Sequence, residues 1–466
     1  MIGFGFGLAI RLGANIVLAR LLFEEAFALM ALVTAVMMGL AMFSDIGLQQ
    51  NVIQSPRGDE PDFLNTAWTM QVIRGVILTM MAALLAWPMA AFYGANDPAA
   101  LELQWLIPLV AMSALIEGLK SPRVLSAARH MRVAQIARIE IAVTTANAIM
   151  LLSLAWYMRS VYALAIAGIL SAALHVALTY WFLPGARARL VLEFAAVRSI
   201  FSFGKWIFLS TLLFFMALQI DRLTFAATYP LSEVGVYSIA ASLALMVSTL
   251  VGKLQSSIVF PWYARMIEDG RALPEAFQRA KLPVLVMSTY LVVLLIVGSN
   301  SFFALAYDHR YAQAAVFLPI LATGVWFSSA GSLYGSAFLV KGLSKWLALV
   351  SGVKVLSFVI LFGLLSRIES TIVMAAIVVL LSELVATLVT RLLGWRLELK
   401  NLRVESAMFV MLVFSSGFGL WLVHRFEPMA KFHPALQLML LGLLVTALFT
   451  PAFLKVLFPI IKQRYT

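Results

Sequence analysis

Apolar stretches long enough to cross a lipid bilayer recur along this chain from Ile2 to Pro459, separated only by short polar segments. The hydrocarbon core of a bilayer needs roughly 20 such residues per helix. Stretches such as Val284 to Val297 are apolar on every side, whereas membrane β-strands alternate polar and apolar residues. Only 12% of the residues are charged, about half the share found in soluble domains. The sequence therefore predicts an all-α polytopic membrane protein.

Basic residues gather in alternate loops between the expected helices. Loops that follow even-numbered helices are rich in arginine and lysine, as at Lys120, Arg123 and Arg129, while loops after odd-numbered helices carry few. By the positive-inside rule this pattern places both termini in the cytoplasm, and its regularity predicts an even number of about 14 helices. The same topology explains the net charge of +12, because the basic residues form no single block of the kind that binds nucleic acid.

The first apolar stretch, which begins at Ile2, is expected to be a transmembrane helix rather than a signal peptide. No basic segment precedes it and no small-residue cleavage site follows it. Because the stretch begins so abruptly, a natural start some residues upstream of Met1 is a further expectation.

A weak internal repeat divides the chain. Residues 22–31 join the first and second expected helices, residues 231–240 join the seventh and eighth, and both lead into a helix rich in small residues. Repeats of this kind are common in transporters. The spacing predicts an N-terminal lobe of six helices in residues 1–198, a second lobe of six helices in residues 199–400, and two extra helices with a short cytoplasmic tail in residues 401–466.

The expected loops are too short to hold a catalytic domain. The longest runs from Phe260 to Lys281, with a short helix expected from Pro274 to Arg279. Enzymes that cut or join glycans at the outer face of a membrane usually need a larger extracytoplasmic loop to hold their site. We therefore expect no catalytic residues. The sequence also lacks cysteine and any Gly-Lys-Ser/Thr phosphate loop. It therefore predicts neither a metal site nor a cofactor.

Two arginines within the apolar stretches are the strongest candidates for a binding site. Arg11 lies near the middle of the first expected helix with Asn15 one turn on, and Gln71 and Arg74 share a face of the third. A charge at a helix centre costs on the order of 3 kcal/mol. No equal number of carboxylates is expected at the same depth, and the arginine fork suits phosphate. A bound anion and a structural role are therefore equally good interpretations.

Structural roles are favoured for the other charged residues inside the membrane. Lys354 and Glu383 lie at similar depth on antiparallel helices and are expected to form an ion pair. His175 is expected to be a satisfied packing residue, since that is the usual role of a lone histidine facing a neighbouring helix. The carboxylates and lysine near the cytoplasmic side are expected to be hydrated or paired with loop arginines; these are Asp45, Glu117, Glu140 and Lys253.

Several local motifs resemble the Wzx-like polysaccharide-exporting flippases of the multidrug/oligosaccharidyl-lipid/polysaccharide transporter superfamily. The first three helices carry Val17-Leu18-Ala19-Arg20-Leu21-Leu22, Phe43-Ser44-Asp45-Ile46-Gly47-Leu48 and Gln71-Val72-Ile73-Arg74-Gly75. The second half carries Phe203-Gly204-Lys205-Trp206, Asp221-Arg222-Leu223, Gly235-Val236-Tyr237-Ser238 and Leu333-Tyr334-Gly335-Ser336-Ala337. The turn Phe23-Glu24-Glu25-Ala26 departs from the family, which has a Thr/Ser-Pro-Glu-Asp-like turn there. Its local geometry is left open.

This resemblance implies a transporter and not an enzyme. The implied substrate is undecaprenyl diphosphate carrying a short oligosaccharide, flipped to the outer leaflet of a bacterial inner membrane for exopolysaccharide or O-antigen synthesis. Substrate-binding residues would be Arg11, Asn15, Gln71, Arg74 and Arg222, and Asp221 would couple transport to an ion. The implied partners are the lipid-linked oligosaccharide and membrane lipids, with the polysaccharide polymerase machinery as a candidate.

Three other functions are weighed against this one. A flippase for the peptidoglycan lipid precursor would share the fold, the helix count and a cationic cavity, and only the local motifs speak against it. A multidrug exporter of the same superfamily would favour buried acids over the buried arginines Arg11 and Arg74, because its usual substrates are cationic. A polymerase or ligase acting on lipid-linked glycans would need an extracytoplasmic domain that the expected loops do not provide.

Overall fold

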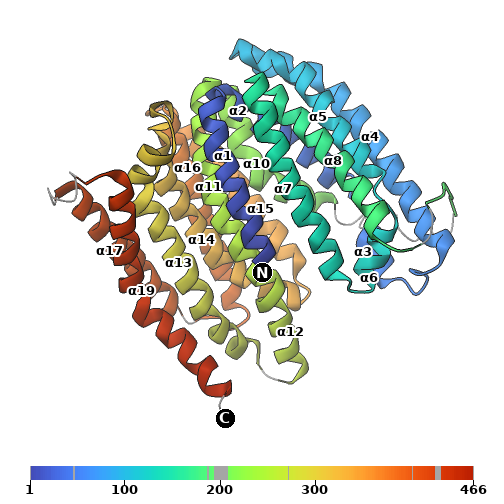
Figure 1. Cartoon of the computed structure of the whole chain (residues 1–466). Helices are drawn as coiled ribbons and strands as arrows, with labels where there is room; N and C mark the ends of the chain where they lie inside the picture. The colour runs from blue at the N-terminus through green and yellow to red at the C-terminus, as the bar shows by residue number, and fades with distance from the viewer. Residues whose placement is uncertain are drawn as a thin grey trace. The chain divides into compact units, whose positions relative to one another are not determined.

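The computed structural model describes residues 2–45, 48–185, 188–193, 208–270, 272–400, 402–425 and 432–464. Every secondary-structure element in the described residues is a helix (Figure 1). Thirteen of the described helices are long and apolar enough to cross a membrane, and α1 (Ile2–Leu21) precedes them in the chain. The prediction of an all-helical, multi-pass membrane protein with about fourteen transmembrane helices is confirmed.

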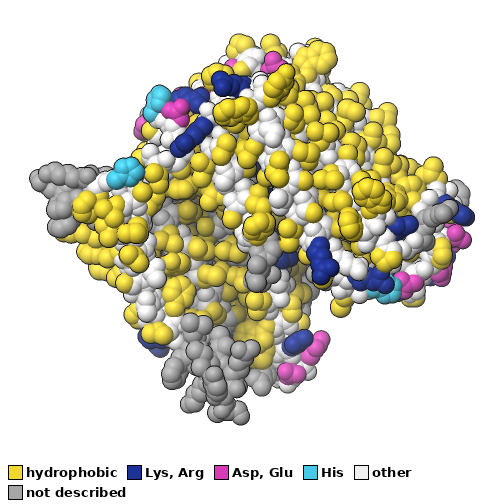
Figure 2. Space-filling view, viewed as in Figure 1, with side chains coloured by type: hydrophobic (Ala, Val, Ile, Leu, Met, Phe, Trp, Pro, Cys, Tyr) yellow, Lys and Arg dark blue, Asp and Glu magenta, His cyan; other side chains and the backbone are white. Residues whose placement is uncertain are grey.

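The surface also has the character of a lipid-facing protein. On the face shown in Figure 2, hydrophobic side chains cover most of the area, and charged side chains lie mainly toward helix ends. Large apolar side chains that would be unfavourable in water are exposed, among them Leu84 at 76%, Trp87 at 70% and Trp105 at 66%. Exposed apolar area on this scale marks contact with lipid rather than with water.

The chain divides into two compact units, residues Met1–Gly235 and Val236–Thr466. The first unit holds α1, α2 (Glu24–Phe43), α3 (Leu48–Gln54), α4 (Pro61–Gly94), η1 (Pro98–Glu102), α5 (Leu103–Gly118), α6 (Arg123–Arg129), α7 (Val133–Met158), α8 (Tyr162–Phe182), α10 (Phe208–Thr228) and the start of α11 (Leu231–Leu254). The second holds the rest of α11, η2 (Gln255–Val259), α12 (Phe260–Glu268), α13 (Leu273–Ala306), η3 (His309–Tyr311), α14 (Ala314–Val340), α15 (Ser344–Leu365), α16 (Ile372–Trp395), α17 (Arg403–Arg425) and α19 (Pro434–Arg464). The lobe bounds inferred from the repeat remain a prediction.

Small residues bring α4 and α5 of the first unit into close contact. A Cβ atom added to Gly75 would lie 3.0 Å from the Ala114 carbonyl oxygen, and one added to Gly118 would lie 3.2 Å from the Gln71 carbonyl oxygen. Glycine at such positions lets membrane helices approach backbone to backbone. As a result, the Gln71 side chain reaches the end of α5, where the carbonyl groups have no partner within the helix.

The structure contradicts the expected long loop between Phe260 and Lys281. Helix α11 continues through a π-helical turn, η2, into α12, and α13 already begins at Leu273. In α12 the apolar side chains of Tyr263 and Met266 are buried while Arg265 faces outward. Arg265, Glu275 and Arg279 therefore lie on the exposed sides of helices rather than in a loop. Pro274 lies in the first turn of α13, where a missing N–H group breaks no hydrogen bond.

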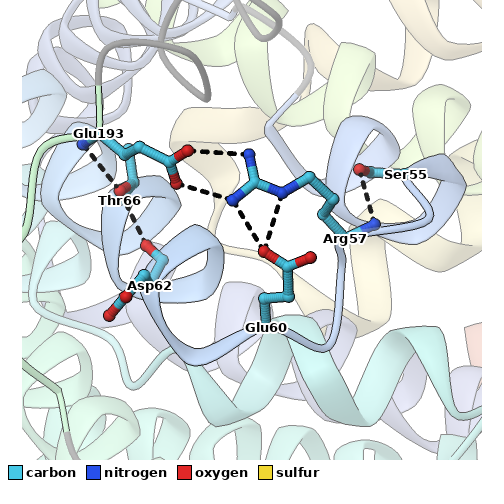
Figure 3. Close-up of polar contacts among 6 residues, drawn as sticks. All are labelled: Ser55, Arg57, Glu60, Asp62, Thr66 and Glu193. Atoms are coloured by element: carbon cyan, nitrogen blue, oxygen red, sulfur yellow. Dashed lines mark hydrogen bonds and ion pairs between the residues drawn. The ribbon is translucent and has the colours of Figure 1, made fainter.

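An extended segment, residues 188–193, docks on the first turns of α4. The backbone amide of Arg189 donates to Asn65 Oδ1 at 3.0 Å, and that of Val191 donates to Thr69 Oγ1 at 3.0 Å. The backbone amide of Glu193 donates to Thr66 Oγ1 at 3.2 Å (Figure 3). Every second residue of the segment is therefore held. These bonds supply hydrogen-bond donors to Asn65, Thr66 and Thr69, which are buried polar side chains of α4.

A bidentate ion pair between Arg57 and Glu193 holds the end of this segment. Arg57 donates from both terminal nitrogens to the two carboxylate oxygens of Glu193, each at 2.9 Å, and also contacts Glu60 (Figure 3). Hydrogen bonding by Arg57 lowers the pKa of Glu193 below its ordinary value of 4.5. A carboxyl group with a lowered pKa stabilises the docked state above its unfolded pKa, and that contribution is lost as the pH falls through the folded pKa.

Glu193→Gln is therefore expected to loosen residues 188–193 at neutral pH. The amide groups of Val191 and Glu193 should exchange hydrogen faster than in the wild type, and their protection should change less on acidification. Hydrogen exchange followed by mass spectrometry measures both, with peptides of α5 as the internal reference. Equal protection in the two proteins at neutral pH would show that the ion pair does not hold the segment.

Candidate functional site

A cavity of about 430 Å³ lies among α1, α5, α7 and α8 of the first unit. We call it the Arg11 cavity. Three helices each line it with two polar side chains one turn apart, which places both on the same helix face. The pairs are Arg11 and Asn15 on α1, Thr144 and Asn147 on α7, and Ser171 and His175 on α8. The sequence predicted Arg11 and Asn15 as binding residues, but it gave no such signal for Thr144, Asn147 or Ser171.

Arg11 is exposed to this cavity near the middle of α1. Among the residues that the structure describes, none forms a hydrogen bond or an ion pair with its side chain. Within an apolar helix bundle an uncompensated cation is unfavourable, unless water or an anion contacts it. Arg11 therefore has the character of a ligand-binding group.

Glu117, near the end of α5, forms the charged wall of the cavity. Its Oε1 atom lies 2.9 Å from His175 Nδ1, and its Oε2 atom lies 2.7 Å from Lys120 Nζ. His175 is thus satisfied, as expected, but by a carboxylate rather than by simple packing. Glu117 was expected to be hydrated or paired with a loop arginine, and a lysine and a histidine take that place.

A second cavity, of about 370 Å³, is also lined by Glu117. We call it the Arg74 cavity. It is bounded by α3, α4, α5 and α6. Its polar lining consists of Asp45, Gln49, Gln71, Arg74, Glu117 and Lys120. Glu117 is shared by both cavities. The structure thus places the two predicted arginines in two neighbouring cavities that meet at one carboxylate.

Arg74 and Gln71 also hold helix ends. Arg74 donates from Nε to Ser44 Oγ at 2.9 Å and from Nη2 to the Ala41 carbonyl oxygen at 2.7 Å, which caps the end of α2. Gln71 Nε2 donates to the carbonyl oxygens of Glu117, Gly118 and Lys120. Both residues therefore have a structural role, and the third arginine nitrogen, Nη1, is what Arg74 can offer to a ligand.

The predicted residues of α10 line neither of these two cavities. Arg222 Nη1 donates to Gln219 Oε1 at 3.1 Å, and Gln219 Nε2 lies 3.1 Å from the sulfur atom of Met38. Arg222 and Asp221 are half-buried. The motif Phe203-Gly204-Lys205-Trp206, which precedes α10, lies outside the described residues, as do Ile46 and Gly47.

The second unit holds a buried charge cluster that the sequence did not predict. Lys281 Nζ of α13 lies 2.6 Å from Glu405 Oε1 of α17, and Arg391 Nε of α16 lies 2.7 Å from Glu405 Oε2. Tyr334 of α14 donates its hydroxyl to the same carboxylate at 2.7 Å. The side chains of Lys281 and Glu405 are 0% and 2% exposed. Four helices of this unit are therefore joined at one carboxylate.

The expected pair of Lys354 and Glu383 is confirmed. Lys354 Nζ on α15 contacts Glu383 Oε1 on α16 at 2.5 Å, and each side chain is 17% exposed. Both charges lie within apolar helices, where the pair neutralises them. This is the structural role that their equal depth predicted.

Comparisons with known proteins agree with the architecture. A family model described as "Polysaccharide biosynthesis protein" matches residues 17–316. A search of curated protein sequences gives no match. The solved lipid II flippase MurJ, in an inward closed conformation, is 13% identical and aligns over 98% of this chain and 99% of its own, with a TM-score of 0.74. An inward-facing multidrug resistance MATE transporter of the MOP superfamily is 14% identical over 86% of this chain and 95% of its own, with a TM-score of 0.66.

The structural similarities show the fold of the chain, and the family match shows its family. Identities this low show that the chain shares the fold of these two proteins, and they show nothing about the substrate of this chain. The family match covers more than half of the chain, and it confirms the resemblance that the motifs of the first three helices indicated. The chain has the helical fold of MurJ and of MATE transporters, and it belongs to the family of polysaccharide biosynthesis proteins.

Proposed function

We propose that this protein flips undecaprenyl-diphosphate-linked oligosaccharide from the cytoplasmic to the periplasmic leaflet of a bacterial inner membrane, for exopolysaccharide or O-antigen synthesis. The observation that carries the proposal is Arg11, a guanidinium that has no partner among the described residues and that lines a cavity with several polar side chains within apolar helices. A diphosphate is the natural complement, because its oxygens accept two parallel hydrogen bonds from one arginine. The isoprenoid tail would stay in lipid between helices.

The Arg74 cavity would serve as the cytoplasmic part of the same route. With both termini in the cytoplasm, the beginning of α4 and the end of α5 face the cytoplasm, and Arg74 Nη1 would meet the diphosphate before Arg11 does. Glu117, shared by the two cavities, would keep the route from holding the anion too tightly. Alternating access of the kind seen in repeat-built transporters would then open the Arg11 cavity to the other side.

Energy for the cycle would come from an ion gradient or from polymerisation of the delivered substrate. Asp221, half-buried beside Arg222 on α10, remains our candidate for the ion-coupling carboxylate. The polysaccharide polymerase machinery is the proposed downstream partner, since it would consume the flipped lipid.

The test is leaflet transfer by purified protein in liposomes containing a lipid-diphosphate-linked oligosaccharide. Wild type should transfer the lipid, and Arg11→Gln should be about tenfold slower or worse, because a charge-assisted hydrogen bond to phosphate is lost. Arg138→Gln, an exposed arginine on α7 that lines neither cavity, should match the wild type. Failure of the wild type to transfer any such lipid would refute the proposal.

One alternative has an observation in its favour. The alignment with the lipid II flippase MurJ spans nearly the whole of both chains, so a peptidoglycan lipid precursor is the second candidate substrate. The same liposomes loaded with that precursor distinguish the two: faster transfer of the precursor than of the polysaccharide lipid would favour this second function.

A further inference from the structure

We propose that the Arg11 cavity also recognises sugar, and that Thr144, Asn147 and Ser171 bind hydroxyl groups of the sugar next to the diphosphate. This inference rests on the proposed function and deepens it. Arg11 would fix the charged part of the head group, and the polar faces of α7 and α8 would determine which glycan is accepted.

The three side chains share one property. They are half-buried, they line the cavity, and within the described part of the chain their polar atoms make no hydrogen bond. Thr145, the neighbour of Thr144, shows the ordinary solution, since its hydroxyl donates to the Ile141 carbonyl oxygen one turn earlier at 2.9 Å. Polar groups left without such a bond in an apolar environment need a polar ligand or water.

The chemistry of the three groups fits sugar hydroxyls better than other ligands. An amide and two hydroxyls each offer both donors and acceptors, as a sugar hydroxyl does. A cationic drug would need a free carboxylate, and Glu117 is already bonded to His175 and Lys120. Leu18, Val143 and Leu151 add apolar surface to the lining, against which the C–H face of a sugar ring can pack. A volume of about 430 Å³ is in the range of small-ligand sites.

Two lipids separate sugar recognition from phosphate recognition. One is the glycan-bearing lipid diphosphate and the other is the same lipid diphosphate without sugar, both followed by leaflet transfer in liposomes. Asn147→Leu is expected to slow the glycan-bearing lipid about tenfold and to leave the sugar-free lipid at the wild-type rate. Arg11→Gln should slow both lipids.

Thr144→Val and Thr145→Val form a matched test and control, because valine has nearly the same shape as threonine but lacks the hydroxyl group. Thr144→Val should lower the rate for the glycan-bearing lipid only, and Thr145→Val should change neither rate, since its hydroxyl is bonded inside its own helix. Thr144→Val carries the same test if Asn147→Leu does not purify as a folded protein.

Each remaining outcome is decisive. If Asn147→Leu and Thr144→Val slow both lipids equally, or slow neither, the sugar subsite is wrong while the flippase assignment stands. If wild type transfers neither lipid, the proposed function fails and the subsite fails with it.

Discussion

Glu405→Ala is expected to destabilise the second unit by about 3–5 kcal/mol, the usual cost of removing one partner from a buried ion pair. The change leaves Lys281, fully buried on α13, and Arg391, on α16, without the carboxylate that both contact. It also removes the acceptor of the Tyr334 hydroxyl. The thermal unfolding midpoint of the purified protein in detergent should fall accordingly.

A matched control exists on the surface of the same unit. Glu275 pairs with Arg279 at 2.6 Å, but the two side chains are 49% and 54% exposed. Exposed pairs of this kind contribute less than about 1 kcal/mol, so Glu275→Ala should barely shift the midpoint. In the double variant Lys281→Met, Glu405→Gln one cation is gone as well, and part of the loss should be recovered. Equal small shifts for Glu405→Ala and Glu275→Ala would show that the buried cluster contributes no net stability.

Much of the fold could be predicted because each transmembrane helix carries its own signal. The apolar stretches predicted the helices, and equal depth on antiparallel helices predicted the pair of Lys354 and Glu383. The Lys281 cluster could not be predicted in the same way. Its members come from four helices that are distant in sequence, and Lys281 was assigned to a loop because the exposed polar side of α13 resembled one. An acid such as Glu405 at the start of a helix is also common without any buried partner.

The residues of the candidate site could also be predicted only in part from the sequence. Arg11 and Asn15 could be identified because a charge and an amide one turn apart stand out in an apolar helix. A single threonine, asparagine or serine in such a helix is ordinary, so Thr144, Asn147 and Ser171 became candidates only when three helices were seen to line one cavity. The structural use of Arg74 depends on where α2 ends, at Ala41 and Ser44, and sequence fixes helix ends only within a few residues.

A single close backbone contact within the first unit, between Gly235 and Glu24, leads to the second large effect. A Cβ atom added at Gly235 would lie 1.9 Å from the carbonyl oxygen of Glu24 and 2.6 Å from its carbonyl carbon. The obstacle is backbone at the start of α2, so no side-chain rotation can relieve it. Glu24 and Gly235, which lie in the two segments from which the repeat was inferred, therefore meet at this point, and only glycine fits.

Gly235→Ala is expected to destabilise the protein by about 1–3 kcal/mol or more, because the backbone near Glu24 or Gly235 must shift to admit the methyl group. Gly252→Ala is the matched control on the same helix, where an added Cβ atom would have nothing within 4 Å. There the better helix propensity of alanine should leave stability unchanged or raise it by up to about 1 kcal/mol. Thermal unfolding of both variants in detergent measures the difference, and equal midpoints would show that a methyl group at Gly235 is accommodated beside Glu24.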